Sequence, residues 1–468
     1  MWRWLRDLAA KDIGAFLAAE LKRPLSRFHS HVKELPQYRF VDLHDAVANR
    51  CQDLGITATI ASDHRSEYLN AILHAKPGRW VSRRVARSAR IAWAVGPAEG
   101  IFLPVDIFWI CAAATGREPL VARVHYDADH EKTIVEAASP DAAAAQSFVT
   151  EALRRADAAS VYRKRVLALR FEPANRDAFG DVEKPERLRV LFAPEPTVDD
   201  DDIVMDVTVR QLLWRNVIDL QLRRDVLKAH GVPIRRGILL HGPPGTGKSF
   251  ACRYLCAKLP DTTRILVAGS ALQHVAAIFA LARLLQPSLV ILEDVDLVFT
   301  TRDINVQGSI LGELLDQMDG LRPHEDVGFV LTTNAIDRIE AAIKERPGRI
   351  SQCIHLGPPG PELRQRYLAR YLTPYVTAAV DIETLVMRSG GTTQAFLKDW
   401  VHRAVQIATE RLAAPGDEAA PVSSASWASR NVRRERRATP ISVPHHLPAA
   451  PAGSPVNLAS AFPSRVLR

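Results

Sequence analysis

The centre of the chain contains the sequence Gly242-Pro243-Pro244-Gly245-Thr246-Gly247-Lys248-Ser249, which fits G-x-x-x-x-G-K-[ST] at every fixed position. The apolar run before it, residues 236–241, is typical of a buried strand. The residues after it, 250–259, have a helical pattern. The sequence therefore predicts a strand, a glycine-rich turn and a helix, which together form a cradle for phosphate.

The residue types in this cradle indicate a nucleotide with a phosphate chain. Glycines let successive backbone N–H groups point at an anion, and the helix N-terminus adds unpaired donors. Lys248 is predicted to reach the β- and γ-phosphates, and the Ser249 hydroxyl is predicted to ligate Mg²⁺. The predicted nucleotide contacts are Gly242, Pro243, Pro244, Gly245, Thr246, Gly247, Lys248, Ser249 and Phe250.

A second signal, about forty residues further on, is an apolar strand at 289–292 that ends in Glu293-Asp294. Carboxylates at this place would lie beside the phosphates, where one holds the Mg²⁺ water shell and the other orients or deprotonates the attacking water. Strand and helix patterns alternate over residues 203–360, which predicts an α/β fold with the parallel sheet of a P-loop NTPase. Residues 361–413 predict a small helical lid.

In these motifs, the region from 203 to 413 resembles an AAA ATPase module of the AAA+ group. Further family elements are matched by Leu331-Thr332-Thr333-Asn334, Met318-Asp319-Gly320-Leu321 and Arg346-Pro347-Gly348-Arg349. The resemblance implies that ATP is the nucleotide and that Asn334 helps to position the hydrolytic water. It also implies a homo-oligomeric ring, expected to be a hexamer, in which Arg346 and Arg349 reach the ATP site of the neighbouring subunit.

The chain departs from the family pattern at the acids and at the lid. The usual Asp-Glu order is reversed to Glu293-Asp294, an order that the chain shares with the mitochondrial AAA translocase of the Rieske protein. By position, Glu293 would hold Mg²⁺ through water and Asp294 would activate the attacking water. In the lid, Gln394 and Phe396 stand where the family has Gly and Asp. The chain resembles bacterial single-module AAA proteins of unassigned role.

The segment between the second strand and the acid strand also departs from the family. AAA modules usually carry an aromatic-glycine pore loop there, and this chain lacks the pair. Residues 271–279 are expected to run on as helix, with His274 on a solvated face; the alternative is that His274 replaces the aromatic residue of the pore loop. Threading of a peptide by this loop is therefore not expected.

The flanking regions carry no motif. Residues 1–195 mix helix and strand patterns and predict an α+β domain of unknown role, in which Asp42 and Asp45 open a helix that closes at Gly55. Strands are expected at 91–95, 100–112, 120–126, 132–136 and 161–171, with helices at 142–156 and 209–229. The tail, 414–468, is rich in Pro, Ala, Ser and Arg and is expected to be disordered.

Composition indicates the cellular context. The five cysteines form no C-x-x-C pair, which favours a reducing compartment, and no apolar run reads as a membrane span. The cytoplasm is the expected location. The net charge is +8, and much of the excess lies near the C-terminus. There, residues 430–437 either form a solvated segment or bind nucleic acid or an acidic partner.

The sequence thus predicts an ATP-hydrolysing AAA module that remodels a protein or complex through its N-terminal domain. One alternative is an ATP-gated assembly scaffold with little hydrolysis, because the acids are reversed. A second alternative is a nucleic-acid-linked ATPase that uses the basic tail.

Overall fold

The structure, a computed structural model, describes residues 13–62, 68–74, 89–114, 116–173, 175–176, 182–184, 187–198, 200, 203–232, 237–299, 304–322, 325–337, 350–375 and 380–413. Arg346, Arg349 and the tail therefore lie outside the described residues. The chain divides into two compact units, which are described separately: a first unit of Met1–Glu195, Arg224–Arg235 and Leu259–Phe329, and a second of Pro196–Arg223, Arg236–Lys258 and Val330–Arg468. Within the described ranges, no helix combines the length and apolarity that a membrane span requires.

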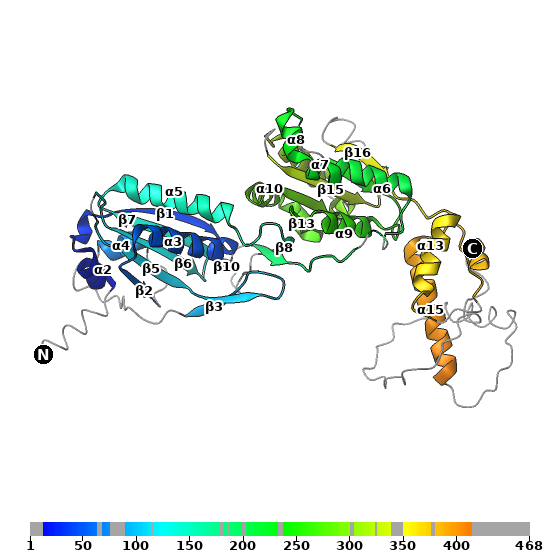
Figure 1. Cartoon of the computed structure of the whole chain (residues 1–468), viewed down its shortest axis with the longest axis horizontal. Helices are drawn as coiled ribbons and strands as arrows, with labels where there is room; N and C mark the ends of the chain where they lie inside the picture. The colour runs from blue at the N-terminus through cyan, green and yellow to red at the C-terminus, as the bar shows by residue number, and fades with distance from the viewer. Residues whose placement is uncertain are drawn as a thin grey trace. The chain divides into compact units, whose positions relative to one another are not determined.

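An antiparallel sheet dominates the N-terminal part of the first unit (Figure 1). Its strand order is β1 (His29–Pro36), β7 (Lys132–Ser139), β6 (Leu120–Asp127), β5 (Asp106–Cys111) and β2 (Ala58–Ala61). One face packs against α3 (Phe40–Leu54) and α5 (Ala142–Ala158), and the other against α2 (Ile13–Leu21) and α4 (Leu69–Leu73). Because successive side chains of a strand alternate between faces, β6 is buried along most of its length. The predicted α+β character is confirmed.

The strand expected over residues 100–112 is in fact two strands in two sheets. β4 (Gly100–Pro104) pairs with β3 (Arg90–Ala94) in a separate hairpin, and β5 begins two residues after β4 ends. Pro104 has no N–H to donate to a ladder, which marks the break. Val105, the residue between β4 and β5, bonds to both sheets. Its N–H donates to Ala89 O next to the hairpin, and its carbonyl accepts from the Tyr126 N–H of the larger sheet.

Helix α3 begins earlier than predicted, because a 3₁₀ turn, η2 (Gln37–Arg39), leads directly into it. Asp42 is therefore not the N-cap. Its side chain is buried, 4% exposed, and accepts a 2.9 Å hydrogen bond from the backbone N–H of Val161. Gly55 ends the helix with a φ of 78°, as predicted. Asp42 thus ties α3 to the segment that follows α5.

We expect Asp42 to make folding stability depend on pH. Burial raises the pKa of Asp42 to about 6, against the opposing effect of hydrogen bonds from Ser160 and Val161. Because the folded state binds this proton more tightly than the unfolded state does, the contribution is full below about pH 4 and is lost as the pH rises through about 6. Asp42→Asn should remove that loss. The free energy of unfolding of the variant, relative to wild type, should rise by on the order of 2 kcal/mol between pH 4 and 6. Urea unfolding across this range measures it, and a constant difference would contradict the expectation.

The remainder of the first unit contains parallel strands. β13 (Thr263–Val267) and β14 (Ser288–Leu292) are parallel neighbours, connected through η5 (Gly269–Gln273) and α10 (Val275–Leu284). On the other side of β13 lies the parallel strand β8 (Val166–Glu172), followed by the antiparallel β11 (Arg187–Phe192). Both β8 and β11 come from residues 1–195, the range predicted as the N-terminal domain. They nevertheless join the sheet that contains β13, a strand of the predicted nucleotide-binding region. The other described elements of this unit are η1 (Leu25–Arg27), β9 (Asn175–Arg176), β10 (Val182–Lys184), α8 (Arg224–Ala229), η6 (Val295–Phe299) and α11 (Ile304–Asp319).

The second unit contains the phosphate-loop strand and the lid. β12 (Gly237–His241) pairs in parallel with β16 (Ile350–His355) and is followed by α9 (Lys248–Lys258). The single helix expected over 209–229 is interrupted: α6 (Val207–Leu213), a π-helical turn (Trp214–Ile218) and α7 (Asp219–Leu222) precede α8. The lid helices α13 (Pro361–Leu372), α14 (Ile382–Arg388) and α15 (Gln394–Ala413) share their own apolar core.

Within the first unit, backbone hydrogen bonds order four strands as β11-β8-β13-β14, and within the second unit β12 pairs with β16. Strand β15 (Val327–Thr333) has residues in both units. The parallel pairs β8–β13, β13–β14 and β12–β16 alternate along the chain with helices. The predicted α/β fold with a parallel sheet and a helical lid is confirmed.

Candidate nucleotide-binding site

The glycine-rich turn has the predicted position between β12 and α9. Three of its glycines have positive φ angles: Gly242 at 150°, Gly245 at 78° and Gly247 at 94°. A Cβ on Gly242 would overlap the carbonyl oxygen of Leu356, so this position needs glycine for space as well as for conformation. All nine predicted nucleotide contacts, residues 242–250, fall in this turn and the first turn of α9.

Side chains of the turn reinforce its shape. Thr246 Oγ1 donates to Pro243 O at 2.8 Å. Lys248, 6% exposed, donates from Nζ to Gly242 O at 2.8 Å and to Pro243 O at 2.9 Å. Its ammonium group therefore lies inside the curve of the loop, where the N–H groups at a helix start favour an anion. Ser249 is exposed on the first turn of α9, so its hydroxyl is available to a metal ion held against phosphate.

Asn334 follows β15 and lies next to the phosphate loop. The Gly242 N–H donates to the carbonyl of Thr333 at 3.4 Å, which joins the end of β15 to the start of the loop. Thr333 is buried, and its hydroxyl accepts from the Ala335 N–H at 3.0 Å, whereas Asn334 is exposed. The structure thus brings Asn334 and the phosphate loop together within the second unit.

The two acids lie in the first unit, directly after β14. Glu293 N–H donates to Val267 O at 2.9 Å, which extends the parallel ladder to the first acid. Asp294 has a φ of 49°, in the left-handed region that non-glycine residues seldom adopt. Its carbonyl accepts from the Leu297 N–H at 2.9 Å and so holds the turn into η6. Such conformations are concentrated at functional sites, so the turn itself supports a role for Asp294.

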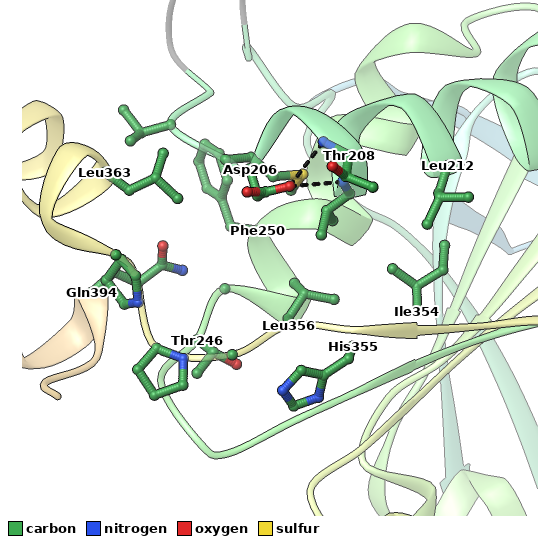
Figure 2. A pocket seen from close by; sticks show the side chains of 18 of the residues that line it. Asp206, Thr208, Leu212, Thr246, Phe250, Ile354, His355, Leu356, Leu363 and Gln394 are labelled. Carbon is green, nitrogen blue, oxygen red and sulfur yellow. Dashed lines mark hydrogen bonds between the residues drawn. The ribbon is translucent and has the colours of Figure 1, made fainter.

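A cavity of about 440 Å³ borders the phosphate loop inside the second unit (Figure 2). Thr246, Gly247 and Phe250 form the part of its wall that belongs to the loop and α9. Largely apolar side chains from three distant segments complete the wall, and among them are Val204, Leu212, Leu356, Leu363 and Tyr367. The size and lining suit a flat, mostly apolar group such as a nucleoside base.

Two polar contacts fix the cavity wall. The Tyr367 hydroxyl donates to the carbonyl of Val204, which joins lid helix α13 to the segment before α6. Asp206 caps α6, and its carboxylate accepts from the N–H groups of Thr208 at 2.8 Å and Val209 at 3.3 Å (Figure 2). Sequence reasoning missed this cavity because most of its wall comes from residues around 204–212, 353–367 and 394, which are distant in the sequence and form no contiguous motif.

The expectation for His274 is wrong. Residues 271–279 do not run on as one helix, because η5 ends at Gln273 and α10 starts at Val275, with His274 between them at φ −108° and ψ 51°. The imidazole stacks on the ring of Phe171, with centroids 3.3 Å apart and planes 8° from parallel. Phe171 is available because β8 pairs with β13, which the sequence pattern did not reveal.

Known proteins similar to this chain are ATPases, which agrees with a phosphate loop between β12 and α9. The model of the ATPase family associated with various cellular activities (AAA) matches residues 238–358. The chain is 32% identical over 203 residues to a 26S proteasome regulatory subunit 8 homolog of Schizosaccharomyces pombe, which covers 39% of this chain and 50% of that protein. It is 36% identical over 186 residues to a 26S proteasome regulatory subunit 6B homolog of Encephalitozoon cuniculi, and this match covers 36% of this chain and 47% of that protein. An ATP-dependent zinc metalloprotease FtsH 2 of Thermoanaerobacter is 29% identical over 205 residues, and this match covers 41% of this chain and 40% of that protein.

Residues 238–358 are therefore an AAA ATPase domain. The predicted family is confirmed, and the ATPase relatives agree with the predicted ATP hydrolysis. The chain spans about half the length of the curated relatives that it matches. The regions outside the alignment carry no assignment from these relatives. The particular likeness to the Rieske-protein translocase stays a prediction.

Proposed function

We propose that this chain binds ATP with its phosphates in the loop 242–249 and its base in the adjoining cavity. The observation that carries the proposal is that one set of residues, Thr246, Gly247 and Phe250, belongs both to the phosphate loop region and to the cavity wall. A nucleotide is the ligand class that has a phosphate chain joined to a flat, largely apolar base. The volume of about 440 Å³ lies within the range of small-molecule sites.

For hydrolysis, each residue has a role that follows from its chemistry. Lys248 contributes a buried positive charge next to the phosphates, and Asn334 orients the attacking water with its amide. Asp294 accepts the proton of that water. Ser249 and, through water, Glu293 would hold Mg²⁺, which supplies charge neutralisation at the β- and γ-phosphates when bound.

The proposed assembly is a homo-oligomeric ring, a hexamer by family resemblance, in which Arg346 and Arg349 act on the neighbouring subunit's ATP. An arginine supplied in this way stabilises charge on the transferred phosphoryl group and is worth about 10³–10⁵ in rate. The proposed output is remodelling of a protein or complex without an aromatic-glycine pore loop. Relatives named as proteasome regulatory subunits and an ATP-dependent protease support a protein as the object of the work.

Contacts inside the first unit support a mechanical role for the N-terminal domain. Arg163, just before β8, donates from its guanidinium to the carbonyl of Leu284, the last residue of α10, at 3.0 Å, and to the carbonyl of Gln286, between α10 and β14. Arg264 of β13 is fully buried and donates to Glu195. Movement of β13 and β14 would therefore be passed to the chain that leads into the N-terminal domain. The protein substrate is proposed to bind there, and a cytoplasmic location stays a prediction.

The test is ATP turnover per subunit, measured against protein concentration for wild type and Arg346→Ala. We expect turnover to rise cooperatively with concentration in wild type and to fall by at least about 100-fold in the variant, because the shared site lacks its trans charge. Mixing the variant with catalytically inactive Lys248→Ala chains should restore part of the activity, since each supplies what the other lacks. Turnover that is independent of concentration and unchanged in Arg346→Ala would contradict the ring.

The reversed acid order favours one alternative, a scaffold that assembles on ATP and hydrolyses little. Asp294 is one methylene shorter than glutamate and has less reach toward water. Tight ATP binding without turnover at any concentration would support this alternative. The nucleic-acid-linked alternative rests on the tail, and unchanged DNA and RNA binding after deletion of residues 414–468 across a salt series would exclude it.

A further inference from the structure

Two histidine side chains lie next to each other at the base of the phosphate loop. His241 is the last residue of β12, and His355 is the last residue of β16. The two strands are parallel neighbours, and in their register His241 lies opposite His355. The Nδ1 atoms of the two imidazoles are 3.4 Å apart, and the ring centroids are 4.9 Å apart with the planes tilted by 43°. Each ring therefore presents one nitrogen to the same small space.

The surrounding backbone fixes this arrangement. The Leu356 N–H donates to the His241 carbonyl at 2.8 Å, which holds the ends of the two strands together. A Cβ on Gly357 would lie 3.1 Å from His355 Nε2, so the glycine leaves room for that edge of the ring, while Nδ1 faces His241. His241 is partly buried, and His355 is exposed and lines the cavity (Figure 2). The pair is thus held in place and is accessible to an ion from solvent.

The distance between the two nitrogens suits a shared metal ion. N–H···O hydrogen bonds in proteins usually span about 2.7–3.2 Å, and the Nδ1–Nδ1 distance of 3.4 Å is long on that scale. Two nitrogens that bind one tetrahedral Zn²⁺ at about 2.0–2.1 Å lie about 3.3–3.4 Å from each other. Imidazole is a ligand that suits Zn²⁺, Cu²⁺ and Ni²⁺, whereas Mg²⁺ prefers oxygen. The pair therefore favours a different class of ion from the one that accompanies ATP.

We propose that His241 and His355 together bind one transition-metal dication, for which Zn²⁺ is the probe. Among the residues that the structure describes, no group of three or more His, Cys, Asp and Glu side chains could hold a metal ion. The two imidazoles are therefore the protein ligands, and water or a small ligand completes the coordination. Because Gly242 follows His241 and Leu356 follows His355, a bound ion joins the carboxyl ends of β12 and β16 next to the phosphate loop. The proposal does not depend on ATP binding, so nucleotide-free protein tests it.

Protection from chemical modification locates the ion without any substitution. Diethyl pyrocarbonate modifies neutral imidazoles, and a metal bound to the ring nitrogen shields it. In the full-length, nucleotide-free chain at about pH 7.5, we expect Zn²⁺ to slow the modification of both His241 and His355 by at least about 10-fold, measured by mass spectrometry of their peptides. The same concentration of Mg²⁺ should protect neither, and the exposed His402 of α15 should react at an unchanged rate. Protection of neither histidine, or of only one, overturns the proposal.

Substitutions then measure the contribution of each ligand. We expect His241→Gln and His355→Gln each to raise the Zn²⁺ dissociation constant of this site at least about 10-fold in isothermal titration, because each removes one of two ligands. His402→Gln is the matched control and should leave the constant within about twofold of wild type. The melting temperature of the metal-free variants checks that they fold, and if both are destabilised, the protection of wild type decides. An unchanged Zn²⁺ dissociation constant in a stable variant overturns the proposal.

Discussion

Lys248→Ala is expected to lower ATP turnover by at least about 100-fold and to weaken ATP binding, because the phosphates lose their buried positive charge. The ammonium group lies within the loop, 2.8 Å from Gly242 O and 2.9 Å from Pro243 O. No other part of the loop supplies a charge, since residues 242–247 are Gly, Pro and Thr. Steady-state phosphate release and titration with ATP measure the two effects.

Lys258→Ala is the control for this prediction. Lys258 ends the same helix, α9, and pairs with Asp200 at 2.8 Å, away from the loop. Its loss should cost only the small energy of a surface ion pair and leave turnover within about twofold. Equal turnover in Lys248→Ala and wild type would exclude the loop as the hydrolytic site.

Arg123→Met is expected to destabilise the N-terminal domain by about 3–5 kcal/mol. Arg123 is 1% exposed and bonds to Asp106 at 2.8 and 2.9 Å and to Glu136 at 3.1 Å. Glu136 also accepts the Leu69 N–H at 2.7 Å, so these groups hold β5, β6, β7 and α4 together. Removing the guanidinium leaves two buried carboxylates without their cation, which is the costly half of a buried pair.

Urea unfolding followed by the fluorescence of the buried Trp93 and Trp109 measures this loss. Arg154→Met is the matched control, because Arg154 pairs with Glu151 on the exposed side of α5. Its effect should stay below about 1 kcal/mol. Similar losses in the two variants would show that the buried network contributes no more than a surface pair.

Local signals made part of this fold predictable. The strand, turn and helix around Lys248 are contiguous, and the requirement for glycine comes from backbone geometry within a few residues. The places of the acids after β14 and of Asn334 after β15 were predictable for the same reason, since each directly follows an apolar strand, while their catalytic roles stay predictions. Gly55 was correctly placed because a positive φ at a helix end is a property of one residue.

Features that depend on distant segments were not predictable from one sequence. The cavity joins Val204, Leu356 and Gln394, which are separated by long stretches of chain. The stacking of His274 on Phe171 depends on the pairing of β8 with β13, and the sequence of a strand does not indicate which strand it pairs with. Asp42 has the residue type of a cap but serves as a buried acceptor, because η2 starts the helix one turn early. The roles of Arg346 and Arg349 stay predictions.

The pairing of β8 with β13 determines where the ATPase can be separated from the rest of the chain. A fragment that began at residue 203, where the family resemblance starts, would lack β8 and β11 and leave the apolar strand β13 with an unpaired edge. Unpaired edges of this kind template association with other chains and aggregation. The fragment would also lose Glu195, the partner of the buried Arg264. We therefore expect a stable fragment that contains the AAA domain to begin upstream of β8, near residue 163, and we expect an exchange of the N-terminal domain to be tolerated at the short connection between α5 and that strand.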